Sequence, residues 1–332
     1  MRGSVQVALR CAVLAALLTG GVRRIAAEEL SGFFPAGAEY AVVFNTERLL
    51  ELPSMRKMLD GGDGENLLAD QVAAFEDCYQ LTIDDCRRIA FVGGGRNLRG
   101  VLIELGKPES ELEKAFLTRG GGYAKTTIRN HTVHLLVDET LGSFGASKIG
   151  LSFLSPQVVL ATEEEYLTPF FDALARGTQK FRPGGSELGW ARFNVAAMTA
   201  KYQKKKKNDF FGSTFRDIRS IGVDFNTAGT GDDGWNLRAV AECVSAEKAQ
   251  QLQTVLPSCL MLAANLLLAN DSDLGMKFIK ATDISADGAN VTLHVKISPE
   301  LAERFGSYFT SESIRRQNAP GSGHSPQTVN QR

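Results

Sequence analysis

Residues 86–117, "CRRIAFVGGGRNLRGVLIELGKPESELEKAFL", carry the local pattern from which the fold can be predicted. Two mainly apolar runs, 88–92 and 99–105, flank the segment 93–97, whose glycines tolerate the positive φ angles of a tight turn. Pro108 and the acidic residues that follow it are typical of the start of a helix. The stretch therefore predicts a strand, a turn, a second strand and a helix, in that order.

A similar order returns at residues 218–256, "IRSIGVDFNTAGTGDDGWNLRAVAECVSAEKAQQLQTVL". The pair Phe193-Asn194 precedes this second stretch, as Phe44-Asn45 precedes the first. We interpret the two halves as divergent copies of one β-α-β-β-α-β-β unit. The alternative is that two unrelated α+β domains share the order by chance. The expected fold class is α+β, with two copies of a mainly antiparallel sheet and helices packed on one face.

Further hairpins are predicted at turn residues. One pair of strands turns around Asn130, and another, within residues 278–298, turns at Asp287-Gly288. Thr46 is a candidate helix cap. The expected first repeat spans 28–178, the junction 179–188, and the second repeat 189–310. Residues 311–332 contain almost no apolar side chains, so we expect a disordered tail.

The N-terminus has the pattern of a secretory signal peptide. Within residues 1–27, Arg2 and Arg10 are followed by the apolar run Cys11 to Val22, and small residues follow that run. The run is shorter than the roughly 20 residues of a membrane span. We expect export to the periplasm or the outside of the cell. Arg23 and Arg24 precede the expected cleavage point, so an uncleaved anchor is the alternative.

Net charge does not favour nucleic acid as a partner. Residues 1–27 contain four arginines and no acid, so their removal leaves 33 basic and 38 acidic residues, a formal charge of −5. Such a balance lacks the basic excess by which proteins bind nucleic acids.

Four cysteines remain after residue 27, and an exported chain can pair them. Cys78 with Cys86, and Cys243 with Cys259, are the local pairings, each worth roughly 2.5 to 3 kcal/mol by loop closure. Four buried free thiols are the alternative. The spacing is not that of a zinc site, and no histidine lies close to either pair in the sequence.

A lysine-rich run is the candidate binding site. It consists of Lys201, Lys204, Lys205, Lys206 and Lys207. It could attach the protein to an anionic lipid surface or polymer, at about 1 kcal/mol per lysine near a charged membrane. The alternative is an ordinary solvated charged segment.

Residues 256–270, "LPSCLMLAANLLLAN", form the most apolar stretch after the expected signal peptide. A helix of that length is about 22 Å long, which is too short to cross a bilayer. Because it is apolar on nearly all sides, it should be covered all round. Either the two halves enclose it or a partner covers one side, and a second copy of the chain is the simplest such partner.

No set of catalytic, metal-binding or cofactor-binding residues converges in the sequence. His131 and His134 are three apart on a predicted strand, so they point to opposite faces and cannot share a metal. Ser54 and Lys57 match S-x-x-K, but the companion motifs of penicillin-recognising enzymes are missing. We therefore expect no metal and no cofactor.

The layout resembles that of functionally uncharacterised exported proteins of planctomycete-like bacteria. The similar phrases are "FFPAGAEYAVVFNTERLLELPSMRKML" at 33–59 and "DGANVTLHVKISPELAERF" at 287–305, and the resemblance covers most of 33–310. It implies a duplicated α+β unit and an envelope location, and it assigns no catalytic residue.

These observations favour a non-catalytic exported protein that binds or supports a component of the cell envelope. Its expected partner is an envelope protein, an anionic polymer or a lipid surface. An exported hydrolase whose active site leaves no sequence motif is the alternative, because active sites assemble in space.

Overall fold

The structure is a computed structural model that describes residues 28–52, 72–73, 76, 81–95, 97–106, 110–111, 114, 122–137, 148–181, 188–200, 216–227, 234–268, 271–301 and 304. The expected signal peptide, the expected tail and the lysine-rich run lie outside these residues, as does most of the expected junction.

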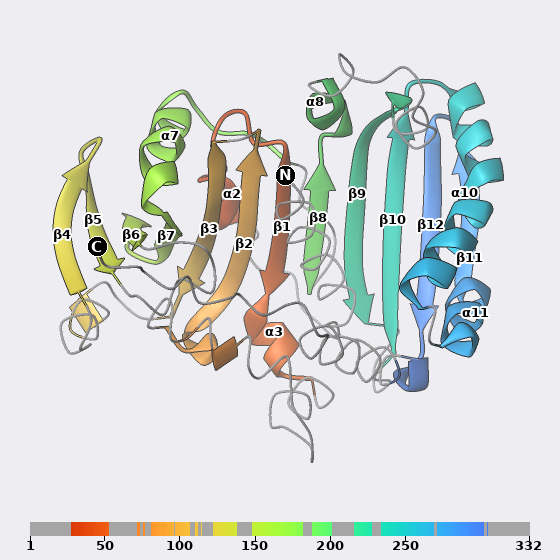
Figure 1. Cartoon of the computed structure of the whole chain (residues 1–332), viewed down its shortest axis with the longest axis horizontal. Coiled ribbons are helices and arrows are strands. Elements are labelled where there is room, and N and C mark those ends of the chain that lie inside the picture. Colours follow the sequence, from red (N-terminus) through yellow and green to blue (C-terminus); the bar gives the residue numbers. More distant parts are fainter. Residues whose placement is uncertain are drawn as a thin grey trace, which may run out of the picture.

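The described strands form one antiparallel sheet in the order β11-β12-β10-β9-β8-β1-β2-β3-β7-β6-β5-β4 (Figure 1). The strands of the first half are β1 (Tyr40–Asn45), β2 (Cys86–Gly94), β3 (Leu98–Leu105), β4 (Gly122–Ile128), β5 (His131–Val137), β6 (Lys148–Ser155) and β7 (Val158–Glu163). Those of the second half are β8 (Gly189–Phe193), β9 (Ile218–Thr227), β10 (Trp235–Cys243), β11 (Thr282–Asp287) and β12 (Asn290–Ile297). The predicted α+β class, with a large antiparallel sheet, is confirmed at this level.

Helices connect several of the strands. They are α2 (Glu28–Ser31), α3 (Thr46–Leu50), the 3-10 helix η1 (Ile83–Asp85), α7 (Glu164–Ala175), α8 (Val195–Ala200), α10 (Ala246–Leu267) and α11 (Ser272–Lys280). A last helical stretch begins at Pro299.

The two halves meet through their first strands. β1 pairs antiparallel with β8, so that Val42 lies opposite Ala191, and on its other edge β1 pairs with β2. The halves therefore share one continuous sheet rather than forming two separate ones. This pairing joins residues about 150 positions apart, and no local sequence signal could specify it.

Helices lie on both faces of the sheet. Residues directly opposite each other on neighbouring strands share a face, and one such row runs from Leu237 through Phe225, Gly189 and Phe44 to Ile89 and Ile103. Leu237 packs below α10 and α11. The neighbour of Ile103, Leu102, points the other way and packs with α7. The expectation that the helices pack on one face is therefore wrong for α7 and α10.

Strand composition explains why both faces are covered in the first half. Consecutive residues Val158 to Ala161 of β7 are all buried and apolar, and in β3 the apolar Leu102, Ile103 and Leu105 are buried together with Glu104. A strand that is apolar on both faces must be covered on both. Continuous apolar runs, rather than alternating ones, were the sequence signal for this arrangement.

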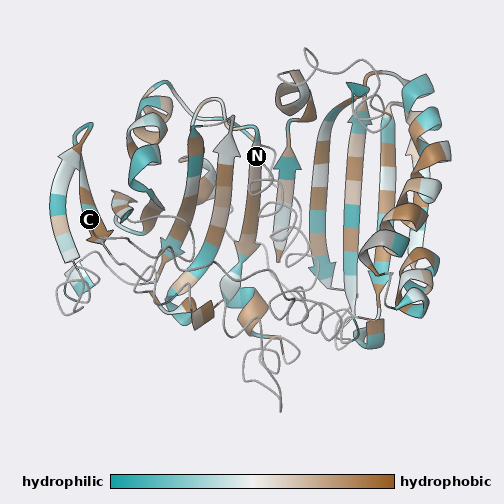
Figure 2. Ribbon diagram, in the orientation of Figure 1, coloured by the Kyte–Doolittle hydropathy of each residue, from teal (hydrophilic) through white to brown (hydrophobic). Residues whose placement is uncertain are grey.

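Strands of the second half alternate instead. Along β10, Trp235 and Leu237 face the helices, whereas Asn236, Arg238 and Glu242 face the opposite side. Figure 2 shows the corresponding alternation of hydrophobic and hydrophilic colour along β10. This is the usual pattern of an antiparallel sheet with one face on a core and the other towards water.

The predicted hairpins are confirmed. β4 and β5 turn at Arg129 and Asn130, whose φ angles are 52° and 66°. β11 and β12 turn at Gly288, with φ of 54°. Both turns need positive φ, which asparagine and glycine adopt more readily than other residues.

Two local predictions were wrong. The cap of α3 is Asn45, whose Oδ1 accepts a hydrogen bond from the Arg48 backbone N–H at 3.2 Å, and Thr46 is the first helical residue. Residues 278–280, expected in a strand, belong to α11. The missed signal was Asp271, a good N-cap residue placed just before the helix.

Candidate interaction surface on α10 and α11

Helix α10 is long and is anchored at its first turn and along its inner side. The Ser245 Oγ accepts a hydrogen bond from the backbone N–H of Lys248 at 3.3 Å, which caps the helix. Ala249 and Leu252 are buried against β10 and β12 in a cluster with Cys243 and Val291. These contacts fix which side of the helix faces away from the sheet.

Beyond its first turn, which carries the exposed Glu247, the outward side of α10 is uncharged. No Asp, Glu, Lys or Arg occurs between Lys248 and Asp271. The exposed positions recur at helical spacing along the outer side, and they are Ala246, Glu247, Gln250, Gln251, Thr254, Pro257, Ser258, Met261, Leu262 and Asn265. The stripe is polar in its first half and mainly apolar in its second.

Helix α11 lies beside the C-terminal half of α10 on the same face of the sheet (Figure 1). Its Leu274 and Phe278 pack with Leu268 in the core beneath the two helices. Met276 lies two residues after Leu274, roughly 200° further around the helix. It therefore points away from the sheet, as do Met261 and Leu262 of α10.

Large apolar side chains are exposed mainly on this pair of helices. Met261, Leu262 and Met276 are each 48% exposed, and Val244, just before α10, is 44% exposed; these are the exposed large hydrophobic residues among those described. We define the α10–α11 surface as Pro257, Met261, Leu262, Asn265 and Met276. On α10 these side chains have an uncharged background, whereas on α11 the exposed Asp273 and Lys280 lie three and four residues from Met276. Methionine is enriched at protein interfaces.

The expectation that the two halves enclose residues 256–270 is therefore wrong. Among the described elements, α10 makes its main contacts with β10, β11, β12 and α11, all of the second half, and Leu268 at its C-cap also shares a core cluster with Leu49 and Leu52 of the first half. The outer side of α10 is not covered by any of these elements, as the exposure of Met261 and Leu262 demonstrates. The alternative, coverage by a partner, stays a prediction.

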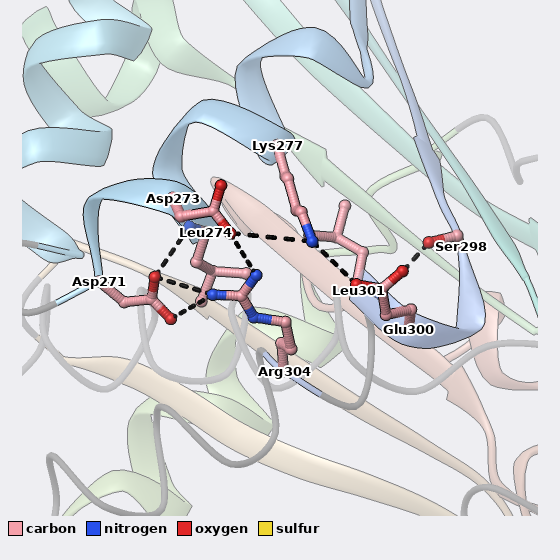
Figure 3. Close-up of polar contacts among 8 residues, drawn as sticks. All are labelled: Asp271, Asp273, Leu274, Lys277, Ser298, Glu300, Leu301 and Arg304. Atoms are coloured by element: carbon pink, nitrogen blue, oxygen red, sulfur yellow. Dashed lines mark hydrogen bonds and ion pairs between the residues drawn. The ribbon is translucent and has the colours of Figure 1, made fainter.

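Charged side chains lie at the N-terminal end of α11, where they contact the helical stretch that follows β12 (Figure 3). Arg304 Nη2 donates to both carboxylate oxygens of Asp271, at 2.9 and 2.8 Å, and its Nη1 donates to Asp273 at 2.6 Å. Lys277 Nζ donates to Glu300 at 2.8 Å. These contacts connect α11 to the helical stretch that follows β12.

The same contacts perturb the acids of the cluster. The backbone N–H of Leu274 and the Arg304 guanidinium hold the pKa of Asp271 below its ordinary value. Arg304 likewise lowers the pKa of Asp273, and Lys277 lowers that of Glu300. All three acids are therefore ionised and paired at neutral pH. These ion pairs connect α11 to the segment that carries Arg304.

A cavity of about 270 Å³ lies at the N-terminal end of α10. Its lining residues are Asp217, Ile218, Cys243, Lys248, Gln251, Leu252 and Val255. Lys248 Nζ is 3.2 Å from an oxygen of Asp217. Burial, and then Asp217, raise the pKa of the Cys243 thiol. A protonated thiol is a poor nucleophile, so Cys243 is not activated in this cavity.

Three of the four candidate disulfide cysteines are free thiols in the structure, namely Cys86, Cys243 and Cys259. Cys78 lies outside the described residues, so the Cys78–Cys86 pairing stays a prediction. Burial raises the pKa of Cys86 to about 12. Cys259 lies seven residues beyond Leu252, which packs on Cys243, and this places it about 10 Å further along the helix.

The two histidines of the sequence analysis lie on opposite faces of β5, as predicted. His131 stacks on Phe171 of α7 with ring centroids 4.2 Å apart. His134 is fully buried, and its Nδ1 is 2.9 Å from the hydroxyl of Tyr123. Within the described part of the chain, no three His, Cys, Asp or Glu side chains form a group that could hold a metal.

The lysines of the candidate binding site, Lys201, Lys204, Lys205, Lys206 and Lys207, lie outside the described residues. Ser54 and Lys57 do so as well. Among the helices described, none combines the length and apolar character needed to cross a membrane.

Comparisons with known proteins give little guidance. No protein-family model matches the chain, and no curated protein matches it. A solved structure titled "Structure of crystal form I of TP0453" aligns at 11% sequence identity with a TM-score of 0.45, covering 85% of this chain and 96% of that one.

Proposed function

We propose that this chain is an exported, non-catalytic protein of the cell envelope that acts by binding another protein through the α10–α11 surface. The observation that carries the proposal is the outward stripe of α10, which is uncharged beyond its first turn and presents Met261 and Leu262 to solvent. Adding Met276, the surface combines methionine and other apolar side chains, with no charge on the α10 part and with Asp273 and Lys280 at its border on α11. That combination distinguishes interface centres from ordinary protein surface.

The state of the described reactive groups supports a binding role. Burial raises the pKa of both Cys86 and Cys243, which keeps the thiols protonated and unreactive. Asp271 and Asp273 form ion pairs with Arg304, and these ion pairs connect α11 to the segment after β12. The sequence pattern of residues 1–27 supports export.

We also propose that the two halves are divergent copies of one unit. From the central β1–β8 pair outwards, the strand order is β1-β2-β3-β7-β6 on one side and β8-β9-β10-β12-β11 on the other. In each half the third strand pairs with the last strand of that half. The β4–β5 hairpin would then be an extension of the first copy.

Crosslinking in native cells, followed by recovery of the protein and mass spectrometry, tests the binding role. The key variant is Leu262→Glu, which places a charge at the centre of the surface. Gln250→Glu is the matched control, because it adds the same charge to the exposed polar half of the same helix. Reproducible adducts that disappear only in Leu262→Glu are expected. Adducts of equal yield in both variants would contradict a role for this surface.

The lysine-rich run is tested in the same experiment. Neutralising Lys204, Lys205, Lys206 and Lys207 should leave the adducts of the α10–α11 surface unchanged. If the adducts disappear with the lysines and persist in Leu262→Glu, the binding site is the lysine-rich run.

A further inference from the structure

We infer that the outer edge of β11 is a docking site for an extended segment of another protein, in which basic residues alternate with apolar ones. The segment would add to the sheet as a further antiparallel strand, a common mode of peptide recognition. The inference rests on the proposed duplication, because the first half shows what the corresponding edge holds. It does not depend on the α10–α11 surface.

The two halves differ at their outer edges. In the proposed duplication β11 corresponds to β6, because each is the fifth strand counted outwards from the β1–β8 pair. β5 pairs antiparallel with the outer edge of β6, so that Leu135 lies opposite Gly150. Among the described strands, none pairs with the outer edge of β11. The position that β5 fills in the first half is therefore open in the described part of the second half.

The open edge of β11 presents backbone N–H and C=O groups. In an antiparallel pair, such groups point alternately towards the neighbouring strand and away from it. The carbonyl of Ala281 accepts a hydrogen bond from the backbone N–H of Lys296 at 3.0 Å, so odd-numbered positions point towards β12. The Ile284 carbonyl instead accepts a long hydrogen bond, 3.5 Å, from the side chain of Gln253 on α10, which a partner N–H could replace. The outward-pointing residues are therefore Thr282, Ile284 and Ala286.

Side chains of β11 define the pattern that the partner needs. Ile284 and Ala286 point towards α10 and pack against its core cluster, where each is still partly exposed. An apolar residue at every second position of the partner would extend this cluster. Asp283, Ser285 and Asp287 point to the other face of the sheet, and all three are exposed. The intervening positions of the partner would lie beside these polar residues.

Charge selects a basic partner. β11 contains two acids and no base, and neither Asp283 nor Asp287 forms an ion pair with a described residue. On β12, the residues opposite them are His294 and the uncharged Asn290. Side chains directly opposite each other on antiparallel strands are close enough to form ion pairs. Lysine or arginine residues four positions apart on the partner would therefore pair with Asp283 and Asp287.

The same acids disfavour a second copy as the partner. Pairing two β11 strands around Ser285 would place Asp283 of one copy opposite Asp287 of the other. Like charges on an edge strand are a common way in which proteins prevent such edge-to-edge pairing.

Titration with synthetic peptides tests the inference. The probe is a fluorescent peptide that alternates lysine and valine, and a second peptide has glutamate at every lysine position. Fluorescence anisotropy should show that the parent protein binds only the lysine peptide. Asp283→Lys combined with Asp287→Lys should weaken this binding about tenfold or more, because two cross-strand ion pairs are lost, and should allow the glutamate peptide to bind.

The matched control is Glu47→Lys combined with Glu247→Lys. It makes the same change of charge at exposed acids outside β11, and it should leave the binding of both peptides unchanged. No binding of the lysine peptide at about 1 mM, the affinity of a marginal contact, would overturn the inference. Equal binding by the parent and by the variant with reversed charges on β11 would overturn it as well.

A second readout tests whether the backbone edge is used. The lysine peptide should slow amide hydrogen exchange at Thr282, Ile284 and Ala286, measured by NMR, and unchanged exchange there would contradict strand addition. Ile284→Pro removes an outward N–H and should abolish binding, whereas Ile284→Val keeps that N–H and should not. Self-association of the parent that Ile284→Pro removes would make a second copy the occupant and overturn the inference. In each failure the binding role of the α10–α11 surface would stand, because Leu262→Glu tests it separately.

Discussion

Arg192 of β8 and Asp224 of β9 form an ion pair across neighbouring strands, with 2.8 Å between Nη2 and Oδ1. Each side chain is only 18% exposed. The Nη1 of Arg192 also donates to the backbone carbonyls of Ala191 and Val223, and its guanidinium lies 5.6 Å from the Trp190 ring centroid. Gly222, opposite Arg192, leaves room for this arrangement, since a Cβ there would lie 3.2 Å from the guanidinium.

This ion pair should stabilise the sheet next to the β1–β8 pairing, where the two halves meet. Asp224→Ala leaves a half-buried guanidinium without its carboxylate, so we expect a loss of about 1.5–3 kcal/mol in the free energy of unfolding. The control is Glu242→Gln, which removes the exposed pair with Arg219 at 3.8 Å and should cost less than about 1 kcal/mol. Equal losses in urea unfolding would contradict this account.

The ion pairs of Arg304 should make stability depend on pH. The folded-state pKa of Asp271 and of Asp273 lies below the ordinary value of 3.8. Their stabilisation is therefore present above pH 3.8 and is lost as the pH falls through the lowered values. Arg304→Met should be less stable than the parent at neutral pH, and the difference should shrink on acidification. Thermal unfolding at several pH values measures it, and a difference that grows in acid would refute the assignment.

Gly100 of β3 should tolerate no larger residue. A Cβ at this position would lie 2.6 Å from Cε2 of Phe170 and 2.8 Å from Cδ1 of Leu160, both parts of a closely packed core. We expect Gly100→Ala to cost about 1–3 kcal/mol through overpacking. Gly106→Ala is the control, because its nearest neighbour is 3.7 Å away. Equal denaturation midpoints for the two variants would show that α7 does not pack here.

Cys86 should be the least reactive of the described thiols. A pKa raised from 9.0 to about 12 lowers the thiolate fraction about a thousandfold at neutral pH. In the reduced, folded protein, an alkylating reagent should modify half-buried Cys259 well before Cys86. Mass spectrometry of a time course measures both rates. Unreduced peptide mapping of the same protein decides the predicted Cys78–Cys86 link, which four free thiols would exclude.

Elements that depend on the conformational preferences of a few neighbouring residues could be predicted from the sequence. Asn130 and Gly288 marked the hairpins because few residues adopt positive φ there. α11 was missed although Asp271 is a strong N-cap signal, because its short apolar pattern was taken for a strand.

The candidate surface could be predicted only in part. The lack of charge from 249 to 270 is visible in the sequence. Which side of α10 faces outwards depends on how the helix packs on β10 and β12, and that depends on pairing between distant strands. The β1–β8 pairing likewise has no local signal, because its partners are separated by most of one half of the chain.

The measurement that tests the central claim most directly is the alkylation rate of a cysteine placed on α10, compared between intact envelopes and dilute purified protein. Leu262→Cys reports on the α10–α11 surface, and Gln250→Cys reports on the polar half of the same helix. We predict that the cysteine at 262 is protected in envelopes and reactive in dilute solution, whereas the cysteine at 250 reacts equally in both. A cysteine at 262 that reacts as fast in envelopes as in dilute solution would show that nothing covers the surface, and would contradict the account.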